Sequence, residues 1–118
     1  MPDTLDTLTA RLIAFRDERD WRQFQSLKNL IVSLNLESAE LLELTQWLDD
    51  EGVEERLVEL EFKEKLAEET ADILLYLLMI CERAGIDLGQ AAARKIDING
   101  AKYPVDKAHG NARKYTEL

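Results

Sequence analysis

Apolar residues recur every three or four positions along nearly the whole chain, which is the period of an α-helix. Gly, Pro and a short aromatic segment, "DWRQF", interrupt this pattern and separate its segments. Four helices are therefore expected, at about Thr4 to Glu18, Ser26 to Gly52, Glu54 to Gly85 and Asp87 to Tyr103. Strand-like alternation is lacking, so the predicted fold is all-α: an antiparallel four-helix bundle forming one domain over residues 1–118, with an irregular tail at 103–118.

Capping chemistry indicates where these helices begin and end. Asp3 or Thr4 is the candidate N-cap of the first helix, and Asp87 is that of the fourth. Gly52 is expected to end the second helix in the left-handed conformation, which glycine adopts without a steric cost. The fourth helix is expected to end just before Pro104. The apolar face of the first helix is expected to comprise Leu5, Leu8, Leu12 and Phe15.

The length of the third helix bears on assembly. From Glu54 to Ala84 it would contain 31 residues and extend for about 46 Å. A compact monomer of this size is only about 35 Å across, so an unbroken helix would project from it. This mismatch predicts a homo-oligomer, unless the third helix breaks near Glu61 to Glu64.

Two glutamates interrupt the apolar faces of the central helices. Glu37 lies within the stripe of the second helix, and Glu69 fills one slot in that of the third. Each is followed one turn later by another acid, Glu40 in "ESAE" and Asp72 in "ETAD". If the helices pack antiparallel, the four carboxylates can converge inside the bundle.

Isolated buried carboxylates are unfavourable by several kcal/mol each. Protonation could relieve this cost, and slightly rotated helices that expose the acids are the alternative. A divalent cation bound by the four carboxylates would compensate their burial best, because Mg²⁺ or Mn²⁺ prefers oxygen ligands. A di-iron bundle would need E-x-x-H motifs, and the only histidine, His109, lies in the tail.

Composition narrows the class of partner. The net charge is −9 and basic residues do not cluster into a nucleic-acid surface. The longest apolar run, 73–81, has nine residues, far short of the roughly 20 that span a bilayer. The single Cys81 fits a reducing compartment, and the acidic N-terminus does not resemble a signal peptide. A soluble cytoplasmic protein without nucleic-acid or membrane partners is expected.

From roughly Arg16 to its end, the chain resembles a known family. The segments "RDWRQF", "ESAELLELTQW", "EETADILLYL", "KIDINGAKYP" and "RKYTEL" carry the likeness. They are similar to the all-α nucleoside triphosphate pyrophosphohydrolases of the MazG type, in particular to the dCTP pyrophosphatase branch. The resemblance implies a magnesium-dependent hydrolase that cleaves a (d)NTP, dCTP or a modified nucleotide, into monophosphate and pyrophosphate, and so removes unwanted nucleotides from the pool.

The resemblance also implies roles for individual residues. Glu37, Glu40, Glu69 and Asp72 become the metal ligands. Glu40 is the first candidate to orient or deprotonate the attacking water, with Glu37 beside it in the catalytic set. Lys95 joins this set as a cation that offsets the charge of the β- and γ-phosphates.

The expected substrate-binding residues include aromatic side chains that frame the base and polar groups near the phosphates. They are Trp21, Phe24, Gln25, Trp47, Tyr76, Lys95, Asn99, Arg113, Lys114 and Tyr115. Trp47 would lie about 15 Å along the helix axis from Glu37 if both belong to one helix. Leu12 and Gln25 depart from the dCTP branch, which has histidines at these positions. The tail with Lys107, Arg113 and Lys114 is expected either to close over the triphosphate or to be disordered.

Two rival functions remain open at the level of sequence. One is a sibling activity on the same scaffold, phosphoribosyl-ATP pyrophosphohydrolysis, which also uses acids on paired helices. The other is a non-catalytic adaptor whose amphipathic helices bind partner helices. The adaptor leaves the acids within the apolar stripes unexplained.

Overall fold

The computed structural model describes residues 2–118, and every regular element in this range is helical. The elements are α1 (Leu5–Glu18), η1 (Arg22–Phe24), α2 (Leu27–Glu43), α3 (Asp50–Arg56), α4 (Leu60–Ala84), α5 (Leu88–Lys102), α6 (Val105–Ala108) and η2 (Tyr115–Glu117). The predicted all-α class is therefore confirmed. The chain divides into two compact units, the first ending at Gly85 and the second beginning at Ile86.

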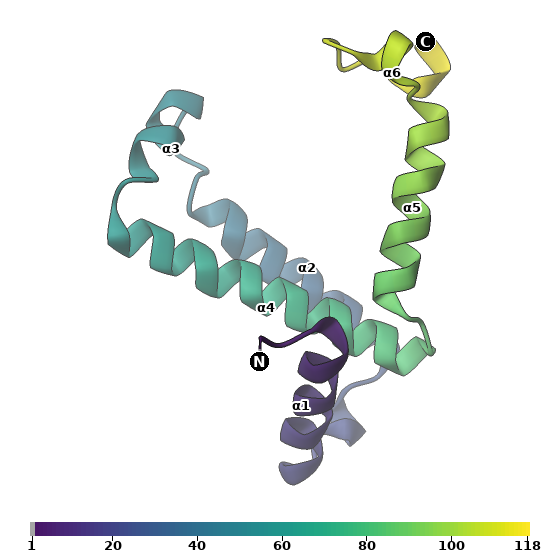
Figure 1. The fold of residues 1–118 in the computed structure, drawn as a ribbon. Coiled ribbons are helices and arrows are strands. Elements are labelled where there is room, and N and C mark those ends of the chain that lie inside the picture. Colours follow the sequence, from purple (N-terminus) through teal and green to yellow (C-terminus); the bar gives the residue numbers. More distant parts are fainter. Residues whose placement is uncertain (1) are drawn as a thin grey trace. The chain divides into compact units, whose positions relative to one another are not determined.

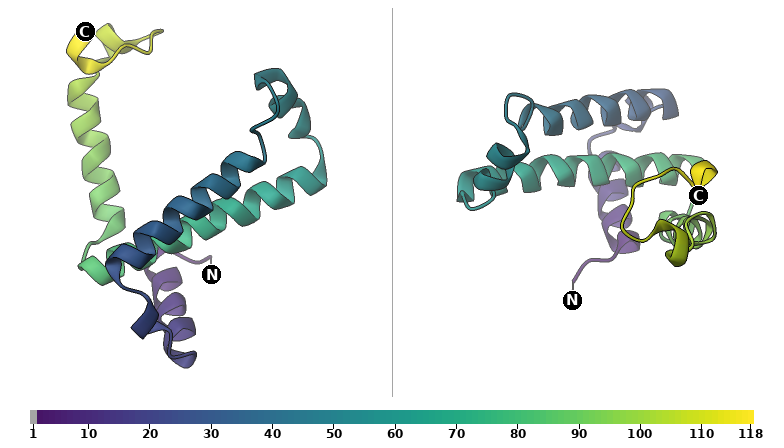
Figure 2. Two further views of the ribbon diagram at one scale, coloured as in Figure 1. Left: turned by 180° about the vertical axis from the view of Figure 1, so that it is seen from behind. Right: turned by 90° about the horizontal axis from the view of Figure 1, so that it is seen from above.

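In the first unit, α2 and α4 run antiparallel side by side, with α3 in the connection between them (Figure 1). The two further views in Figure 2 show the same pairing. α1 packs against α4. The apolar side chains that become buried are Leu30 of α2 and Phe62, Leu78 and Met79 of α4. This small core fixes α2 and α4 against each other.

The predicted boundaries of two helices are confirmed by their caps. The Thr4 hydroxyl accepts a hydrogen bond from the Thr7 backbone N–H at 3.1 Å, and the Thr7 hydroxyl accepts one from the Thr4 N–H at 2.7 Å. This reciprocal pair satisfies donors that the first turn leaves free. The Asp87 carboxylate accepts from the Gln90 N–H at the start of α5. Gly85 ends α4 with φ 71°, which glycine tolerates.

The boundary between the second and third predicted helices is wrong. α2 ends at Glu43, nine residues before Gly52, and Gly52 lies inside the short helix α3 rather than at a C-terminus. The Asp49 carboxylate caps α3 by accepting from the Gly52 N–H at 2.8 Å. A Cβ on Gly52 would lie 3.0 Å from the same carboxylate oxygen. The glycine thus permits a close cap at the beginning of a helix.

The third predicted helix is also divided. Residues 57–59 separate α3 from α4, a few residues before the expected breakpoint at Glu61 to Glu64. α4 contains 25 residues and extends for about 37 Å. The helix length therefore no longer argues for an oligomer, because it is close to the width of a compact monomer of this size.

The second unit contains α5 and a tail that is more ordered than predicted. α6 and η2 are helical segments within the predicted irregular region. The Tyr115 ring packs edge-on against Tyr103, with 6.1 Å between centroids, and Lys102 lies 4.6 Å from the Tyr115 ring. The Asn111 side chain donates to the Lys107 carbonyl. These contacts fold the tail back onto the end of α5.

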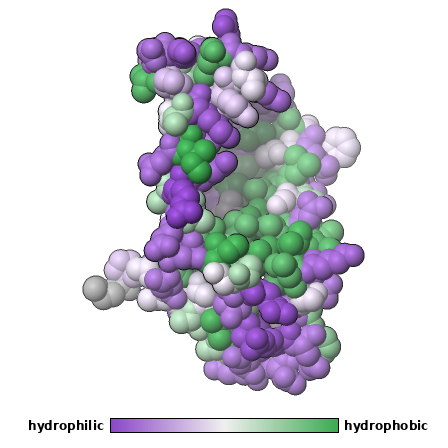
Figure 3. All heavy atoms as spheres, turned by 90° about the vertical axis from the view of Figure 1, so that its right-hand side faces the viewer, coloured by the Kyte–Doolittle hydropathy of each residue, from purple (hydrophilic) through white to green (hydrophobic). Residues whose placement is uncertain are grey.

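Much apolar surface stays exposed. Figure 3 shows hydrophobic side chains at the surface. On α2 alone, five large apolar side chains are exposed: Leu27, Ile31, Val32, Leu36 and Leu42. None of the helices described is both long enough and apolar enough to cross a membrane.

Candidate metal centre and substrate cavity

Three acids meet between α2 and α4. Glu37 and Glu40 come from α2 and Glu69 from α4, and one carboxylate oxygen of each lies within 4.8 Å of the others. Glu37 and Glu69 are half-buried, as their places in the apolar stripes predict, whereas Glu40 is exposed. Asp72 stands outside this group of three but near enough for its charge to act on both glutamates.

The electrostatics of the acidic cluster, Glu37, Glu40, Glu69 and Asp72, disfavour full ionisation. Burial raises the pKa of Glu37, and the adjacent Glu40 carboxyl and then the Asp72 charge raise it further. The pKa of Glu69 is raised by the same causes in the same order. Like charges held this close and partly out of water repel one another, so the cluster favours the uptake of positive charge.

Neither Lys nor Arg supplies that charge. Across residues 2–118, the ion pairs involve other acids and leave the cluster without a cation. One oxygen of Glu37 and one of Glu69 are buried without a hydrogen-bond partner. Buried acceptors in this state are costly, and hard oxygen donors are what Mg²⁺ and Mn²⁺ prefer. The residues present therefore fit a divalent cation.

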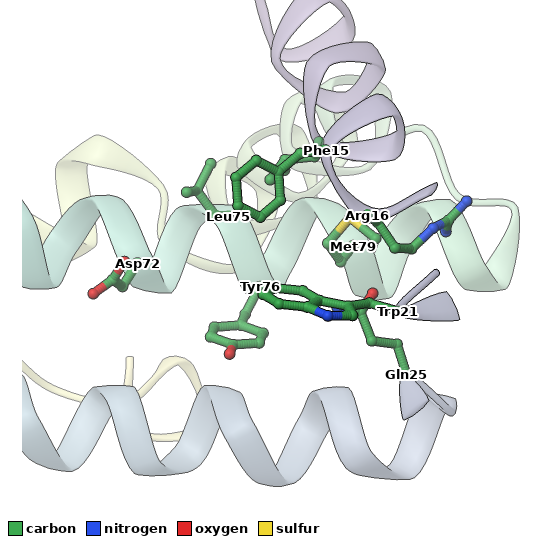
Figure 4. Close-up of a pocket in the computed structure, with 9 residues that line it drawn as sticks. Phe15, Arg16, Trp21, Gln25, Asp72, Leu75, Tyr76 and Met79 are labelled. Carbon is green, nitrogen blue, oxygen red and sulfur yellow. The ribbon is translucent and has the colours of Figure 1, made fainter. Parts of the chain in front are cut away.

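Beside the acids lies a cavity of about 260 Å³ between α1, η1 and α4. Its apolar wall is formed by Leu12, Phe15, Leu75 and Met79. Polar or aromatic groups complete it: Arg16, Trp21, Gln25, Asp72 and Tyr76. In Figure 4, Asp72 lies toward one end, Arg16 and Trp21 lie toward the other, and Tyr76 lies between them. Because Asp72 also belongs to the acidic cluster, the cavity adjoins the candidate metal centre.

A tight turn brings Trp21 to this cavity. Asp20, with φ 52°, adopts the left-handed conformation that Asp tolerates better than most residues. The Trp21 N–H then bonds back to the Arg16 carbonyl at 3.0 Å. The indole ring meets Phe15 edge-on, with 5.8 Å between centroids. The predicted substrate-binding residues Trp21 and Gln25 thus line one cavity with Tyr76 of α4, which is distant from them in the sequence.

Sequence reasoning missed Arg16 as a cavity residue. Arg16 is 4% exposed, whereas the neighbouring Phe15, assigned to the apolar face, is 46% exposed. Arg16 donates from Nε to Asp17 at 2.9 Å and from Nη1 to Glu82 of α4 at 3.1 Å. Its position four residues after Leu12 is a signal that it shares the buried face, and Glu82 is a partner that only the packing of α1 on α4 reveals.

Two predicted aromatic residues do not join the cavity. Phe24 is 65% exposed and Trp47 is 87% exposed. The expectation that Trp47 continues the helix of Glu37 is wrong, because α2 ends at Glu43 and Trp47 lies in the turn that follows. Neither ring lines the cavity, and the roles of Phe24 and Trp47 toward a substrate stay predictions.

The other predicted site residues belong to the second unit. Lys95 and Asn99 lie exposed on α5, one turn apart. Arg113 and Lys114 lie between α6 and η2, and Tyr115 packs against Tyr103. Their roles toward a substrate stay predictions.

Comparison with known proteins agrees with this picture. The sequence pattern of the MazG-like family matches residues 32–118. The chain is 40% identical to dCTP pyrophosphatase 1 of Bos taurus over 115 residues, which cover 98% of this chain and 68% of the bovine protein. It is 38% identical to the Homo sapiens protein of the same name, with the same coverage. A crystal structure of a pyrophosphatase from Archaeoglobus fulgidus matches with a TM-score of 0.77 and 40% identity, covering 88% of this chain and 95% of that one.

These likenesses confirm the predicted enzyme class, a hydrolase that acts on the pyrophosphate bonds of nucleotides. They extend over the helices that carry both the acidic cluster and the cavity. The chain therefore belongs to the MazG-like family.

Proposed function

We propose that this protein is a magnesium-dependent pyrophosphohydrolase that cleaves a (d)NTP between the α- and β-phosphates. The observation that carries the proposal is the pair of buried carboxylate oxygens without partners, on Glu37 and Glu69, beside a cavity with aromatic walls. One end of this arrangement can hold a cation with the triphosphate, and the other can hold a base. Such a cation explains how a protein with a net charge of −9 can bind a polyanion.

Glu37, Glu40, Glu69 and Asp72 would hold the metal ion. When bound, Mg²⁺, or Mn²⁺ in its place, supplies Lewis-acid polarisation of the phosphoryl group and neutralises its charge. The half-buried Glu37 and Glu69 fix the position of the site, because α2 and α4 pack on either side of them. Asp72 joins the site to the cavity that it also lines.

Glu40 is the acid best suited to move a proton. It is exposed, whereas its neighbours Glu37 and Glu69 are half-buried, so a water molecule can approach it. Its carboxylate can orient that water or accept its proton during attack on the α-phosphate. We assign Lys95 and Asn99 of α5, with Arg113, Lys114 and Tyr115, to the outer phosphates, where cations offset charge most when water is excluded.

The cavity would receive the base. Trp21 and Tyr76 offer ring surfaces, and stacking on one aromatic ring contributes about 1–3 kcal/mol in single-stranded nucleic-acid complexes. The relatives named dCTP pyrophosphatase 1 support dCTP, or a modified (d)NTP, as the substrate. Removal of unwanted nucleotides from the pool is the role that this reaction would serve.

The direct test measures pyrophosphate released from a panel of canonical and modified triphosphates, in magnesium and in chelator. We expect monophosphate and pyrophosphate in equimolar amounts with magnesium, and a loss of turnover in chelator that added Mg²⁺ or Mn²⁺ restores. Hydrolysis in ¹⁸O-water should label the monophosphate, because the attack is at the α-phosphate. Release of inorganic phosphate, or turnover that chelator leaves unchanged, contradicts the proposal.

Assembly into a homodimer or homotetramer is part of the proposal. The exposed apolar side chains of α2, such as Ile31 and Leu36, form a surface that a second copy can cover. Light scattering coupled to size exclusion should give a multiple of 13.6 kDa, and a monomer would contradict the assembly.

The free Cys81 fits the reducing cytoplasm in which we place this enzyme. We also propose that residues 1–118 act as one functional domain.

A further inference from the structure

Trp21 stands on the least regular backbone of the cavity wall. The other lining residues belong to the long helices α1 and α4, apart from Gln25, which directly follows η1. Trp21 follows the left-handed turn at Asp20 and precedes η1. Its N–H bonds to the Arg16 carbonyl at 3.0 Å, and its carbonyl accepts from the Phe24 N–H at 2.9 Å. These bonds fix the main chain but not the side-chain torsions, so the ring needs packing to lock its rotamer.

Two successive contacts link the Trp21 ring to Arg19. The ring meets Phe15 edge-on, with 5.8 Å between centroids, and both rings line the cavity (Figure 4). The Arg19 guanidinium carbon lies 3.5 Å from the centroid of the Phe15 ring, inside the roughly 6 Å limit of a cation–π contact. Arg19 Nη1 also donates to the Phe15 carbonyl at 2.9 Å. Arg19 therefore holds Phe15 both by its ring and by its backbone.

The other contact of the Arg19 side chain is weak. Arg19 is exposed, and its ion pair with Glu18, at 3.6 Å, involves an acid that is more exposed still. An exposed pair of this kind contributes little to stability. Phe15 is also exposed, so the guanidinium covers a ring that the packing of α1 on α4 leaves open. Arg19 thus supports one aromatic ring, whereas Arg16 is a buried charge paired with acids.

We propose that Arg19 is a positioning residue, which fixes the Phe15 ring and through it holds the Trp21 indole in the cavity wall. The inference rests on the proposed function where it concerns the substrate, because the base must then stack on Trp21. Arg19 is not among the residues that line the cavity, so its effect on a ligand would pass through the two rings. A ring that is held in advance need not be ordered when the ligand binds, and such ordering weakens affinity.

The kinetic test compares Arg19→Met with Arg22→Met, assayed with dCTP and magnesium. Arg19→Met keeps the aliphatic part of the side chain but removes the guanidinium from Phe15. It should raise KM by about 3–10-fold, the usual effect of having to order one side chain on binding, and leave kcat within about 2-fold of the parent. A loss confined to kcat would overturn the inference.

The control separates positioning from charge. Arg22 lies on η1 next to Trp21, is exposed, and takes part in none of the ion pairs or cation–π contacts found within residues 2–118. Arg22→Met removes the same charge and should keep the parent KM. A rise in KM of the same size in both variants would come from charge alone and would overturn the inference.

A double-mutant cycle tests whether Arg19 acts through Phe15. Phe15→Leu removes the ring on which the guanidinium lies. In that background, adding Arg19→Met should change KM by less than about 2-fold, because the contact that Arg19→Met breaks is already lost. If the two substitutions instead raise KM additively, Arg19 does not act through Phe15 and the inference fails.

The mobility of the Trp21 ring can be measured without turnover, which separates the inference from the proposed function. In a Trp47→Phe background Trp21 is the only tryptophan, so the decay of fluorescence anisotropy reports on this ring alone. We expect Arg19→Met to add a nanosecond component of ring motion that Arg22→Met lacks. If the parent protein releases no pyrophosphate from dCTP, the enzymatic proposal fails and the anisotropy decides the role of Arg19. Equal decays in the two variants overturn the inference, whatever the kinetics show.

Discussion

The first unit contains buried ionisable groups in two opposite environments, one with counter-charges and one without. Arg16 is buried between two carboxylates, Asp17 and Glu82, which satisfy its charge. Glu37 and Glu69 are half-buried among further acids, and each keeps an oxygen without a partner. Both arrangements use an acid of α4, and the two acids, Glu69 and Glu82, lie about three and a half turns apart on that helix.

The presence or absence of an internal counter-charge distinguishes a buried charge that serves the fold from buried charges that serve a ligand. A buried charge that the protein pairs internally is complete without a ligand, and its loss is felt in folding. Buried charges that the protein leaves unpaired make the free protein less stable, and they persist where a ligand compensates them. The acidic cluster is therefore expected to control turnover, and Arg16 is expected to control stability.

The largest expected effect tests the functional side of this comparison. Glu40→Gln removes the acid proposed to act on water while retaining its size. Turnover should fall by about 10²–10⁴-fold, the usual contribution of a general base, while the circular dichroism spectrum stays that of the parent. Glu64→Gln, an exposed acid on α4, is the control and should stay near parent activity. Activity of Glu40→Gln within a few-fold of the parent would show that the cluster is not catalytic.

The next effect concerns the aromatic wall of the cavity. Trp21→Ala should weaken nucleotide binding by about 10–100-fold, which corresponds to loss of one stacked ring. Phe24→Ala is the matched variant, because Phe24 lies three residues away but outside the cavity. It should change KM by less than about 3-fold. Equal losses in the two variants would mean that the cavity does not hold the base.

The structural side of the comparison predicts a change in folding. Arg16→Met retains the apolar part of the side chain and leaves Glu82 without its cation, so the free energy of unfolding should fall by about 1–3 kcal/mol. Arg11→Met removes an ion pair to Asp3 that is shorter, at 2.6 Å, but whose Arg11 side chain is 69% exposed. It should cost less than about 1 kcal/mol. Urea denaturation measures the free energy of unfolding of both variants. A larger loss in Arg11→Met than in Arg16→Met would contradict the role assigned to burial.

The smallest effect is the pH dependence of the metal-free protein. Because folding raises the pKa of Glu37 and Glu69 above 4.5, their protonated forms are favoured in the folded state. Their contribution to stability is present below about pH 4.5 and is lost as pH rises through the raised values. Thermal unfolding in chelator should therefore show a decline in stability above pH 4.5 that is shallower in Glu69→Gln than in Glu64→Gln. Excess magnesium should remove most of this difference, and identical pH profiles would contradict the unpaired state of Glu69.

Local patterns are what the sequence predicts well. The stripes on α2 and α4 mark Glu37 and Glu69 as inward-facing because helical periodicity depends only on spacing along one chain. Thr4 and Asp87 mark helix starts for the same reason. The end of α2 was predicted wrongly because Gly52 suits both a helix end and a close N-terminal cap, and only the position of Asp49 decides between them.

Packing between helices is what the sequence leaves open. Trp21, Gln25 and Tyr76 share a cavity only because α1 crosses α4 and Asp20 turns the chain back. The pairing of Arg16 with Glu82 joins residues 66 positions apart, which no periodicity encodes. Trp47 lies beyond the end of α2, so its predicted place on the helix of Glu37 is wrong, while its role toward a substrate stays a prediction.

The central claim is that a divalent cation compensates the unpaired acids. Anomalous diffraction from crystals grown with Mn²⁺ tests it most directly. The account predicts a single strong peak among Glu37, Glu40 and Glu69, about 2.0–2.2 Å from the carboxylate oxygens that lack partners, and no peak in crystals of Glu69→Gln. Well-ordered parent crystals without a peak at this position would contradict it.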